Sequence, residues 1–161
     1  MDPSPTARLT EPVGTFGAGA TPAGAGGTTP CPCGGVPPGA GLEDCCGPVV
    51  RGDVLAPTAE RLMRSRYTAY VVGDGAHLFR TWHARTRPDD TAPDPRVRWL
   101  GLEGLDAVDG GDADATGVVE FRARWISADR GPVRRGELHE RSRFTRRAGR
   151  WLYLDGEAAE R

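Results

Sequence analysis

Residues 118–127 read VVEFRARWIS, a segment in which hydrophobic and charged side chains alternate. Successive side chains of an extended strand point to opposite faces, so the hydrophobic members share one face and the charged members share the other. The hydrophobic face consists of Val119, Phe121, Ala123 and Trp125. The segment therefore predicts a β-strand that packs one face against a core and exposes the other face to water.

Further strands are predicted on both sides of this segment. Residues 97–102 and 137–146 also alternate, and residues 150–155 follow a turn at 147–149. A stretch rich in Gly and Asp at 109–114 provides the turn before the central strand. The pattern indicates three or four consecutive antiparallel strands.

Two predicted helices precede the strands. The first begins after Thr58, a residue type that caps helix N-termini, and ends at Gly73. The second begins after Asp74 and continues through Trp82, before a loop at 84–95. The hydrophobic stripe of the first helix comprises Met63, Tyr67, Tyr70 and Val71. Helices followed by strands indicate an α+β domain, with the helices packed on one face of a curved antiparallel sheet.

Composition divides the 161 residues into four parts. Residues 1–30 are rich in Gly, Ala and Pro and lack hydrophobic periodicity, so we expect a disordered tail. Residues 31–56 hold all four cysteines, and this segment is called the knuckle below. The α+β domain is expected at 57–156 and a short C-terminal tail at 157–161.

No hydrophobic run approaches the roughly 18–20 residues that a membrane-spanning helix needs. The N-terminus also lacks the charged and then hydrophobic pattern of a secretory signal. We therefore expect a cytoplasmic protein without a membrane segment. Thiols stay reduced in that compartment, so clustered cysteines indicate metal ligands there more often than disulfides.

The knuckle carries Cys31 and Cys33 as a C-x-C pair, followed by adjacent Cys45 and Cys46. Four thiolates can enclose one tetrahedral zinc ion, and a site without an open coordination position is structural and not catalytic. Disulfides, or reduced thiols without a ligand, are the alternatives. If zinc is bound, we expect the knuckle to present a rigid surface to a partner protein.

The order of several short blocks resembles the YchJ-like family of uncharacterised bacterial proteins. The cysteine stretch resembles the SEC-C motif, the zinc-binding segment at the C-terminus of the SecA translocation motor. The blocks downstream are PTAE at 57–60, LMRSRYTAY at 62–70, TWH at 81–83, WLGL at 99–102, ERSRF at 140–144 and WLYLDG at 151–156. The resemblance implies a zinc knuckle before a domain similar to nuclear transport factor 2 (NTF2), a cone of curved sheet closed by helices. This fold hosts binding proteins as well as small isomerases and dehydratases, so it does not define an activity.

The knuckle departs from the usual SEC-C pattern in its longer spacing. Eleven residues separate Cys33 from Cys45, and Leu42 stands where an aromatic residue is usual. Longer loops cost little closure entropy, so the ligands can still meet.

Glu140 is the main candidate for chemistry. It shares a strand face with Leu138 and Phe144, so it points into the cone if they do. A carboxylate in a hydrophobic cavity can act as a general base. The alternative is an ion pair with Arg64 or Arg66 of the first helix. The predicted cavity wall comprises Arg64, Arg66, Tyr67, Tyr70, Trp82, Trp99 and Glu140.

His83 follows the second predicted helix and is a second candidate for a proton carrier. The alternative is a histidine that contacts the last carbonyl groups of the helix. A nucleic-acid surface is the least favoured site: residues 122–150 contain ten Arg, but alternating arginines are usually the solvated face of a strand, and the net charge is −1.

Two functions follow from these patterns. The favoured one is a protein-interaction or ligand-binding module with a structural four-cysteine zinc site and a cavity in the α+β domain. The alternative is a small cofactor-independent enzyme, of isomerase or hydrolyase type, with Glu140 or His83 as general base. No nucleotide-binding loop or catalytic triad order supports a specific reaction.

Overall fold

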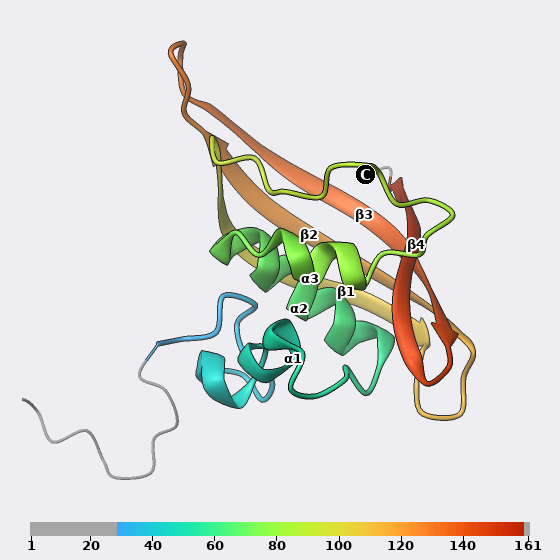
Figure 1. The fold of residues 1–161 in the computed structure, drawn as a ribbon. Helices are drawn as coiled ribbons and strands as arrows, with labels where there is room; N and C mark the ends of the chain where they lie inside the picture. Colours follow the sequence, from blue (N-terminus) through green and yellow to red (C-terminus); the bar gives the residue numbers. More distant parts are fainter. Residues whose placement is uncertain (1–28, 160–161) are drawn as a thin grey trace, which may run out of the picture.

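The computed structural model describes residues 29–159. The disorder expected for residues 1–30 falls, apart from Thr29 and Pro30, outside the described residues. Among these residues, the first helical segments are a short 3₁₀ helix, η1 (Leu42–Asp44), and α1 (Gly47–Arg51). It continues with α2 (Ala59–Val72) and α3 (Gly75–Arg80) before the sheet begins (Figure 1).

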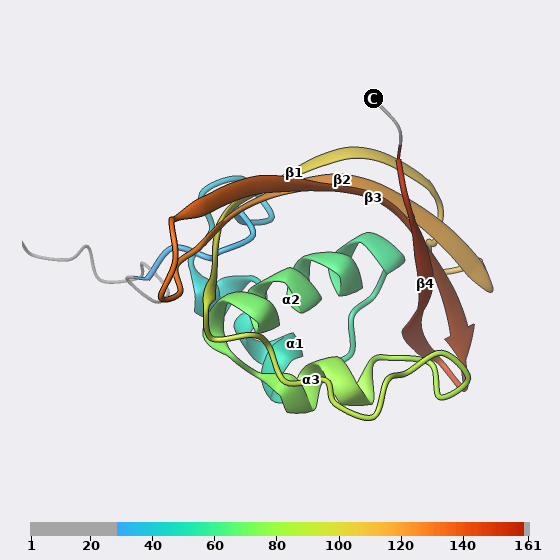
Figure 2. The same ribbon diagram turned by 90° about the horizontal axis from the view of Figure 1, so that it is seen from above.

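In the part of the chain that the structure describes, the sheet has four strands in the order β1-β2-β3-β4, and each strand is antiparallel to its neighbour. The strands are β1 (Val97–Asp109), β2 (Thr116–Ser127), β3 (Arg134–Arg147) and β4 (Arg150–Ala158). Irregular pairing interrupts the register of β1 with β2 and of β3 with β4. Such bulges bend a sheet. The sheet here curves around α2, while α3 lies farther from it (Figure 2). The predicted α+β class with a curved antiparallel sheet is confirmed.

Helix α2 has the predicted ends. The Thr58 hydroxyl accepts a hydrogen bond from the Arg61 amide at 3.1 Å, and Gly73 ends the helix with a φ of 81°. The hydrophobic stripe was predicted less well, because Val71 is exposed. Several polar side chains of the helix, among them Ser65 and Thr68, are buried although they lie outside the predicted hydrophobic stripe. The sheet, the knuckle and α3 surround this helix, so its buried surface is wider than one stripe.

Helix α3 starts after Asp74 as predicted, with the Asp74 carboxylate accepting from the His77 amide at 2.9 Å. It ends at Arg80, and the predicted continuation through Trp82 is wrong. The chain instead runs beside β4: the Tyr153 amide donates to the Thr81 carbonyl at 2.7 Å, and the His83 amide donates to the Tyr153 carbonyl at 2.8 Å. Backbone pairing with β4 therefore replaces the last helical turn.

The strands extend beyond the predicted segments. Strand β1 continues to Asp109, β3 begins at Arg134, and β4 reaches Ala158, two residues past the predicted end of the domain. The turn after β1 packs against the start of α2, where the Ala59 amide donates to the Gly110 carbonyl at 2.9 Å. Gly110 has a φ of 83°, and a Cβ atom there would lie 2.7 Å from the Ala59 side chain. This turn therefore requires glycine for both its conformation and its packing.

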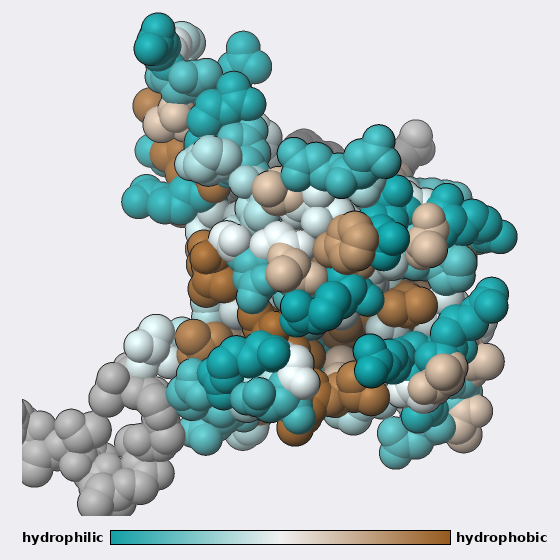
Figure 3. Space-filling view, viewed as in Figure 1, coloured by the Kyte–Doolittle hydropathy of each residue, from teal (hydrophilic) through white to brown (hydrophobic). Residues whose placement is uncertain are grey.

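Two hydrophobic clusters form the core. The first lies between α2 and the sheet and includes Leu62, Met63, Phe144 and Trp151. The second joins the four cysteines to Tyr67 of α2 and Ala123 of β2. On the surface, hydrophobic side chains appear in several groups interrupted by hydrophilic ones (Figure 3).

Candidate metal centre and cavity

Local hydrogen bonds shape the knuckle. The Cys31 amide donates to the Ala40 carbonyl at 3.2 Å, and the Leu42 amide donates to the Thr29 carbonyl at 2.8 Å, which closes the loop between the two pairs of cysteines. Gly35 has a φ of 88°, and a Cβ atom there would overlap with the Ala40 backbone. The lengthened loop therefore folds back on itself and leaves the two cysteine pairs together.

The four sulfur atoms form one compact group. The Sγ–Sγ distances are 3.5 Å for Cys31–Cys33, 3.6 Å for Cys33–Cys45 and 3.8 Å for Cys45–Cys46. All four atoms lie within 4.8 Å of one another. Zinc–sulfur bonds of about 2.3 Å in a tetrahedron require sulfur atoms about 3.8 Å apart. The separations are too long for disulfides, whose S–S length is about 2.05 Å. The donor set therefore fits a tetrahedral metal ion.

The surroundings of the sulfur atoms also suit thiolates. The four side chains are only 1–4% exposed. The Gly35 amide donates to the Cys33 sulfur at 3.4 Å, and the Thr68 hydroxyl lies 3.8 Å from the Cys31 sulfur. Hydrogen bonds of this kind orient metal ligands and stabilise their charge.

Cys31 and Cys33 oppose each other's ionisation. The hydrogen bond with Cys33 lowers the pKa of the Cys31 thiol, whereas the same bond and burial raise the pKa of Cys33 to about 11. One ionised thiol thus makes ionisation of its neighbours harder. A divalent cation would remove this conflict, because it binds all four as thiolates.

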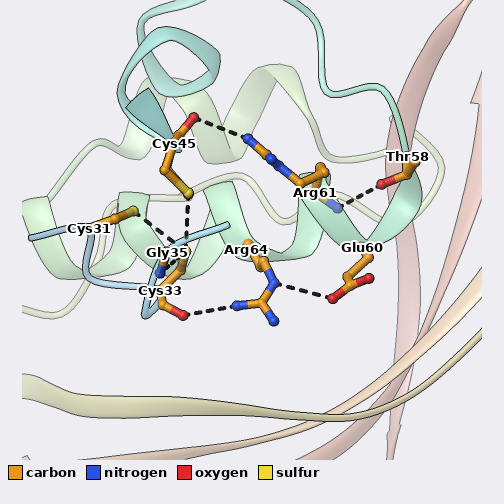
Figure 4. A network of polar contacts seen from close by, with 9 residues as sticks. Cys31, Cys33, Gly35, Cys45, Thr58, Glu60, Arg61 and Arg64 are labelled. Atoms are coloured by element: carbon orange, nitrogen blue, oxygen red, sulfur yellow. Dashed lines mark hydrogen bonds and ion pairs between the residues drawn. The ribbon is translucent and has the colours of Figure 1, made fainter. Parts of the chain in front are cut away.

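Two arginines fasten the knuckle to α2 (Figure 4). The Arg64 Nη1 atom donates to the Cys33 carbonyl at 3.0 Å, and Arg61 Nη2 donates to the Cys45 carbonyl at 3.3 Å. Arg64 also forms an ion pair with Glu60, with 3.3 Å between Nε and Oε1. The backbone of each pair of cysteines is therefore bonded to the same helix.

A second feature is a cavity between α2 and the sheet, with a volume of about 200 Å³. Its wall is mainly aromatic and contains two charged side chains, Arg66 and Glu140. The lining residues are Met63, Arg66, Tyr67, Tyr70, Trp82, Trp99, Phe121, Ala123, Leu138, Glu140, Ser142, Phe144 and Tyr153.

Six of the seven predicted wall residues lie in this lining, and Arg64 does not. Residues two apart on a helix point to nearly opposite sides, because each residue turns the helix by about 100°. Arg66 faces the cavity, so Arg64 faces away from it, toward the knuckle. The assignment of Arg64 to the wall is therefore corrected.

Glu140 points into the cavity, but the predicted ion pair with Arg64 or Arg66 is wrong. Within residues 29–159, no arginine lies within 4.0 Å of its carboxylate. The carboxylate accepts hydrogen bonds from the Ser142 hydroxyl at 2.7 Å and the Tyr153 hydroxyl at 3.0 Å. Burial and Glu140 together raise the pKa of Tyr153, burial being the larger cause. The nearest partners of Glu140 are thus neutral donors from its own sheet.

Arg66 is the most buried charged group of the cavity, with 6% of the residue exposed. Its Nη1 atom donates to the Leu78 carbonyl at 3.1 Å and to the Thr81 hydroxyl at 2.8 Å. The guanidinium carbon lies 4.9 Å from the Trp82 ring centre and 4.6 Å from that of Tyr153. Burial lowers the pKa of Arg66 to about 10, so the group stays cationic at neutral pH.

His83 lies outside the cavity lining. Its Nδ1 atom accepts a hydrogen bond from the Arg85 amide at 3.1 Å, and its carbonyl accepts from the amides of Thr86 and Arg87 at 3.0 Å. The side chain therefore stabilises the turn after α3. This position does not match either interpretation of His83, as a proton carrier at the cavity or as a contact for the last carbonyl groups of the helix.

Sequence reasoning missed Ser142 and Tyr153 as partners of Glu140. Alternation places Ser142 on the strand face of Glu140, but it does not show that the two side chains are bonded. Tyr153 could not be found from the sequence, because the register of β3 and β4 shifts between Arg143 and Phe144. That shift decides which residue of β4 meets Glu140.

The arginines of the opposite sheet face pair with acidic side chains. Arg141 forms ion pairs with Glu120 at 2.8 Å and Asp106 at 3.3 Å, and Arg122 lies 3.6 Å from Glu137. These pairs balance much of the positive charge on this face. The pairing favours the interpretation of a solvated face over a nucleic-acid surface.

Comparisons with known proteins agree with this arrangement. The model of the YchJ middle NTF2-like domain matches residues 58–156. A UPF0225 protein of Streptomyces coelicolor is 52% identical over 130 residues, which are 81% of this chain and 96% of that protein. A UPF0225 protein of Cupriavidus metallidurans is 46% identical over 141 residues, and the match covers 83% of this chain and 92% of that protein.

Two solved structures have a similar fold. One is the solution structure of a SEC-C motif containing protein from Rhodopseudomonas palustris, 33% identical, with a TM-score of 0.66 over 82% of this chain and all of that one. The other is the crystal structure of a SEC-C motif containing protein from Psychrobacter arcticus. It is 24% identical, with a TM-score of 0.63 over 83% of this chain and 85% of that chain. Across residues 29–159, no helix is both long and hydrophobic enough to cross a membrane.

Proposed function

Because this chain belongs to the UPF0225 family of YchJ-like proteins, whose domain is NTF2-like, we propose that it is a zinc-stabilised ligand-binding protein. Zinc would hold the knuckle on α2, and the cavity between α2 and the sheet would hold a small molecule. The observation that carries the proposal is an aromatic cavity that contains two charged groups not paired with each other. Sites of this kind, hydrophobic with a few polar groups, are typical of ligand binding.

The proposed zinc site consists of Cys31, Cys33, Cys45 and Cys46. The sulfur separations and the burial of the four side chains support it. Four thiolates leave no open position, so the metal would act by folding the knuckle and not as a Lewis acid. Zinc is the usual occupant of such a set, since thiolate ligands select it over harder cations.

Elemental analysis tests the metal. The protein purified without chelator should contain about one zinc per chain, and Cys45→Ser should lose most of it. Cys45→His is the matched control, because imidazole can replace a thiolate in a tetrahedral site. A wild-type protein with well under one zinc per chain, or Cys45→Ser with undiminished zinc, would refute this part of the proposal.

The size of the cavity limits the ligand. An engineered hydrophobic cavity of about 150 Å³ binds benzene. The cavity of about 200 Å³ therefore suits one ring with a short substituent. NMR titration with single-ring compounds should shift resonances of the lining residues. Ala123→Phe would fill the cavity from β2 and should abolish those shifts. Because Ala123 also packs with the cysteines, zinc content and circular dichroism are measured on the same variant.

A second function rests on Glu140. Its carboxylate lies in the cavity and accepts from neutral donors, so it is free of an arginine partner among the described residues. A general base needs such access to a substrate proton. Turnover of a bound compound by the wild-type protein, lost in Glu140→Gln with binding intact, would establish this enzyme function.

The predicted protein partner of the knuckle and the cytoplasmic location stay predictions. The cysteine side chains face α2, so a partner would meet the outer loop, where Pro37, Pro38 and Gly39 are exposed. Deletion within this loop should weaken the binding of such a partner without releasing zinc.

A further inference from the structure

Arg66 is a buried cation with unused hydrogen-bond donors. Among the described residues, only Nη1 donates to protein acceptors, namely the Leu78 carbonyl and the Thr81 hydroxyl. Across residues 29–159, Nε and Nη2 donate to no protein group, and no carboxylate lies within 4.0 Å of the guanidinium. The rings of Trp82 and Tyr153 cover part of its surface.

This arrangement is costly unless an anion completes it. Buried arginines are rarely without a charged partner, because an unpaired cation loses its hydration on folding. Two neutral acceptors and two ring faces offset only part of that loss. A guanidinium presents its N–H groups in a planar fork that matches the two oxygens of a carboxylate. The unused side of Arg66 therefore suits a carboxylate supplied from outside the chain.

Glu140 does not take this place. The Tyr153 hydroxyl donates to its carboxylate, while the guanidinium of Arg66 lies over the ring of the same tyrosine. Glu140 is also held by Ser142. Tyr153 thus lies between Glu140 and Arg66. The Glu140 carboxylate lies at the hydroxyl end of Tyr153, and the Arg66 guanidinium lies over its ring.

We propose that the cavity binds a small monocarboxylate with a single-ring or similarly sized hydrophobic body, whose carboxylate contacts Arg66. The proposal rests on the proposed function, since it names the class of ligand for that same cavity. The aromatic lining and the volume of about 200 Å³ define the body. Among residues 29–159, Arg66 is the one cationic side chain of the lining, and a single guanidinium suits a monoanion better than a phosphate dianion.

Three probes of similar size and different charge test the class of ligand. They are phenylacetate, its neutral isostere phenylacetamide, and the cation 2-phenylethylamine, each titrated into the zinc-loaded full chain by NMR. Phenylacetate should bind at least about tenfold more tightly than phenylacetamide, which corresponds to one charge-assisted contact. 2-Phenylethylamine should bind more weakly than both.

Two variants locate the contact. Arg66→Met keeps a long hydrophobic side chain and should reduce phenylacetate binding to the level of the amide. Glu140→Gln removes the negative charge of the same cavity and should strengthen phenylacetate binding. Arg130→Met, at an exposed position outside the lining, is the control and should leave it unchanged. If Arg66→Met does not fold, the comparison of the three probes on the wild-type protein still decides the question.

The outcomes separate this inference from the proposed function. Equal binding of phenylacetate and phenylacetamide, or a preference for the amine, would overturn the monocarboxylate assignment and leave a ligand-binding cavity. Phenylacetate binding that survives Arg66→Met unchanged would also overturn it. Absence of binding by all three probes would overturn both the monocarboxylate assignment and the proposed ligand-binding function.

Discussion

Gly156 leaves the space that the carboxyl group of Glu140 occupies. It pairs with Ser142 across β3 and β4, and a Cβ atom there would overlap with the Glu140 carboxylate. Its backbone does not need glycine for its φ angle, since no positive φ is found there. The missing side chain therefore serves the position of Glu140 and not the geometry of the strand.

Gly156→Ala should displace Glu140 and break its bond with Tyr153. We expect a loss of about 1–2 kcal/mol in the free energy of unfolding, typical of one buried hydrogen bond. Urea denaturation measures it, with Gly131→Ala as control because a Cβ at Gly131 meets nothing within 4 Å. In a Glu140→Ala background the cost of Gly156→Ala should largely disappear. A cost that is equal in both backgrounds would contradict this cause.

His77 should make the protein less stable in mild acid. It is 2% exposed, and its Nε2 atom lies 2.9 Å from the Ser65 hydroxyl. Burial, followed by Arg80 and Arg66, lowers its pKa from 6.5 to about 4. Between these two values the unfolded chain takes up a proton that the folded chain does not. The free energy of unfolding should therefore fall by about 2 kcal/mol from pH 7 to pH 5 through this residue.

Urea denaturation of wild type and His77→Gln at both pH values checks this expectation. Loss of any bound metal in acid would affect both proteins, so the difference between their pH slopes isolates His77. Equal slopes would show that His77 is not the group responsible.

Side-chain alternation predicted the direction of Glu140 but not its partner. The face of a strand follows from its period of two, so Leu138, Glu140 and Phe144 could be placed together. Which helical residue lies opposite depends on the rotation of α2 over the sheet. Arg64 and Arg66 stand on opposite sides of that helix, and nothing in the local sequence distinguishes them.

At the scale of elements, α2 connects the two candidate sites. One side carries Arg61 and Arg64, which bind the backbone of the knuckle, and another carries Arg66 and Tyr70 of the cavity wall. Its ends are fixed by Thr58 and Gly73. The position of this helix therefore determines both sites.

Arg64→Met should loosen the knuckle without unfolding the helix. The substitution keeps the aliphatic stem and removes the bond to the Cys33 carbonyl. Zinc should pass to a competing chelator several-fold faster, while the helical circular dichroism stays unchanged. Arg130→Met, at an exposed position in the turn after β2, is the control. Identical release rates for the two variants would exclude a role for Arg64 in holding the knuckle.

Both ends of α2 and the start of α3 were predicted better than the strand ends. Thr58, Gly73 and Asp74 act through local capping bonds, which a short sequence contains in full. The ends of β1 and β3 are rich in Asp and Arg and bury little, so alternation stops before the strands do. Backbone pairing with the neighbouring strand extends them, and such pairing depends on residues far away in the sequence.

At the scale of the whole molecule, the knuckle and the NTF2-like domain share a core. The cysteines pack with Val50, Tyr67 and Ala123, which come from α1, α2 and β2. The sequence predicted a separate module with few hydrophobic residues of its own. Its packing against α2 could not be foreseen, because the residues that receive it are spread over distant elements.

Removal of zinc should therefore destabilise the entire domain. Metal binding energy becomes folding energy when the ligands belong to the core. We expect the melting temperature of the sheet, followed by tryptophan fluorescence, to fall by at least about 5 °C in the metal-free protein. Readdition of one equivalent of zinc should restore it. A sheet that melts at the same temperature with and without metal would indicate an independent knuckle.

Tyr67 lies in the cluster around the cysteines and also in the wall of the cavity. A movement of this ring would change the packing at both sites. Binding at one site can therefore change the affinity of the other through this one side chain. Thermodynamic reciprocity then sets a strict condition: if zinc strengthens ligand binding by some factor, the ligand strengthens zinc binding by the same factor. If that factor is greater than one, the protein would retain its metal best when its cavity is full.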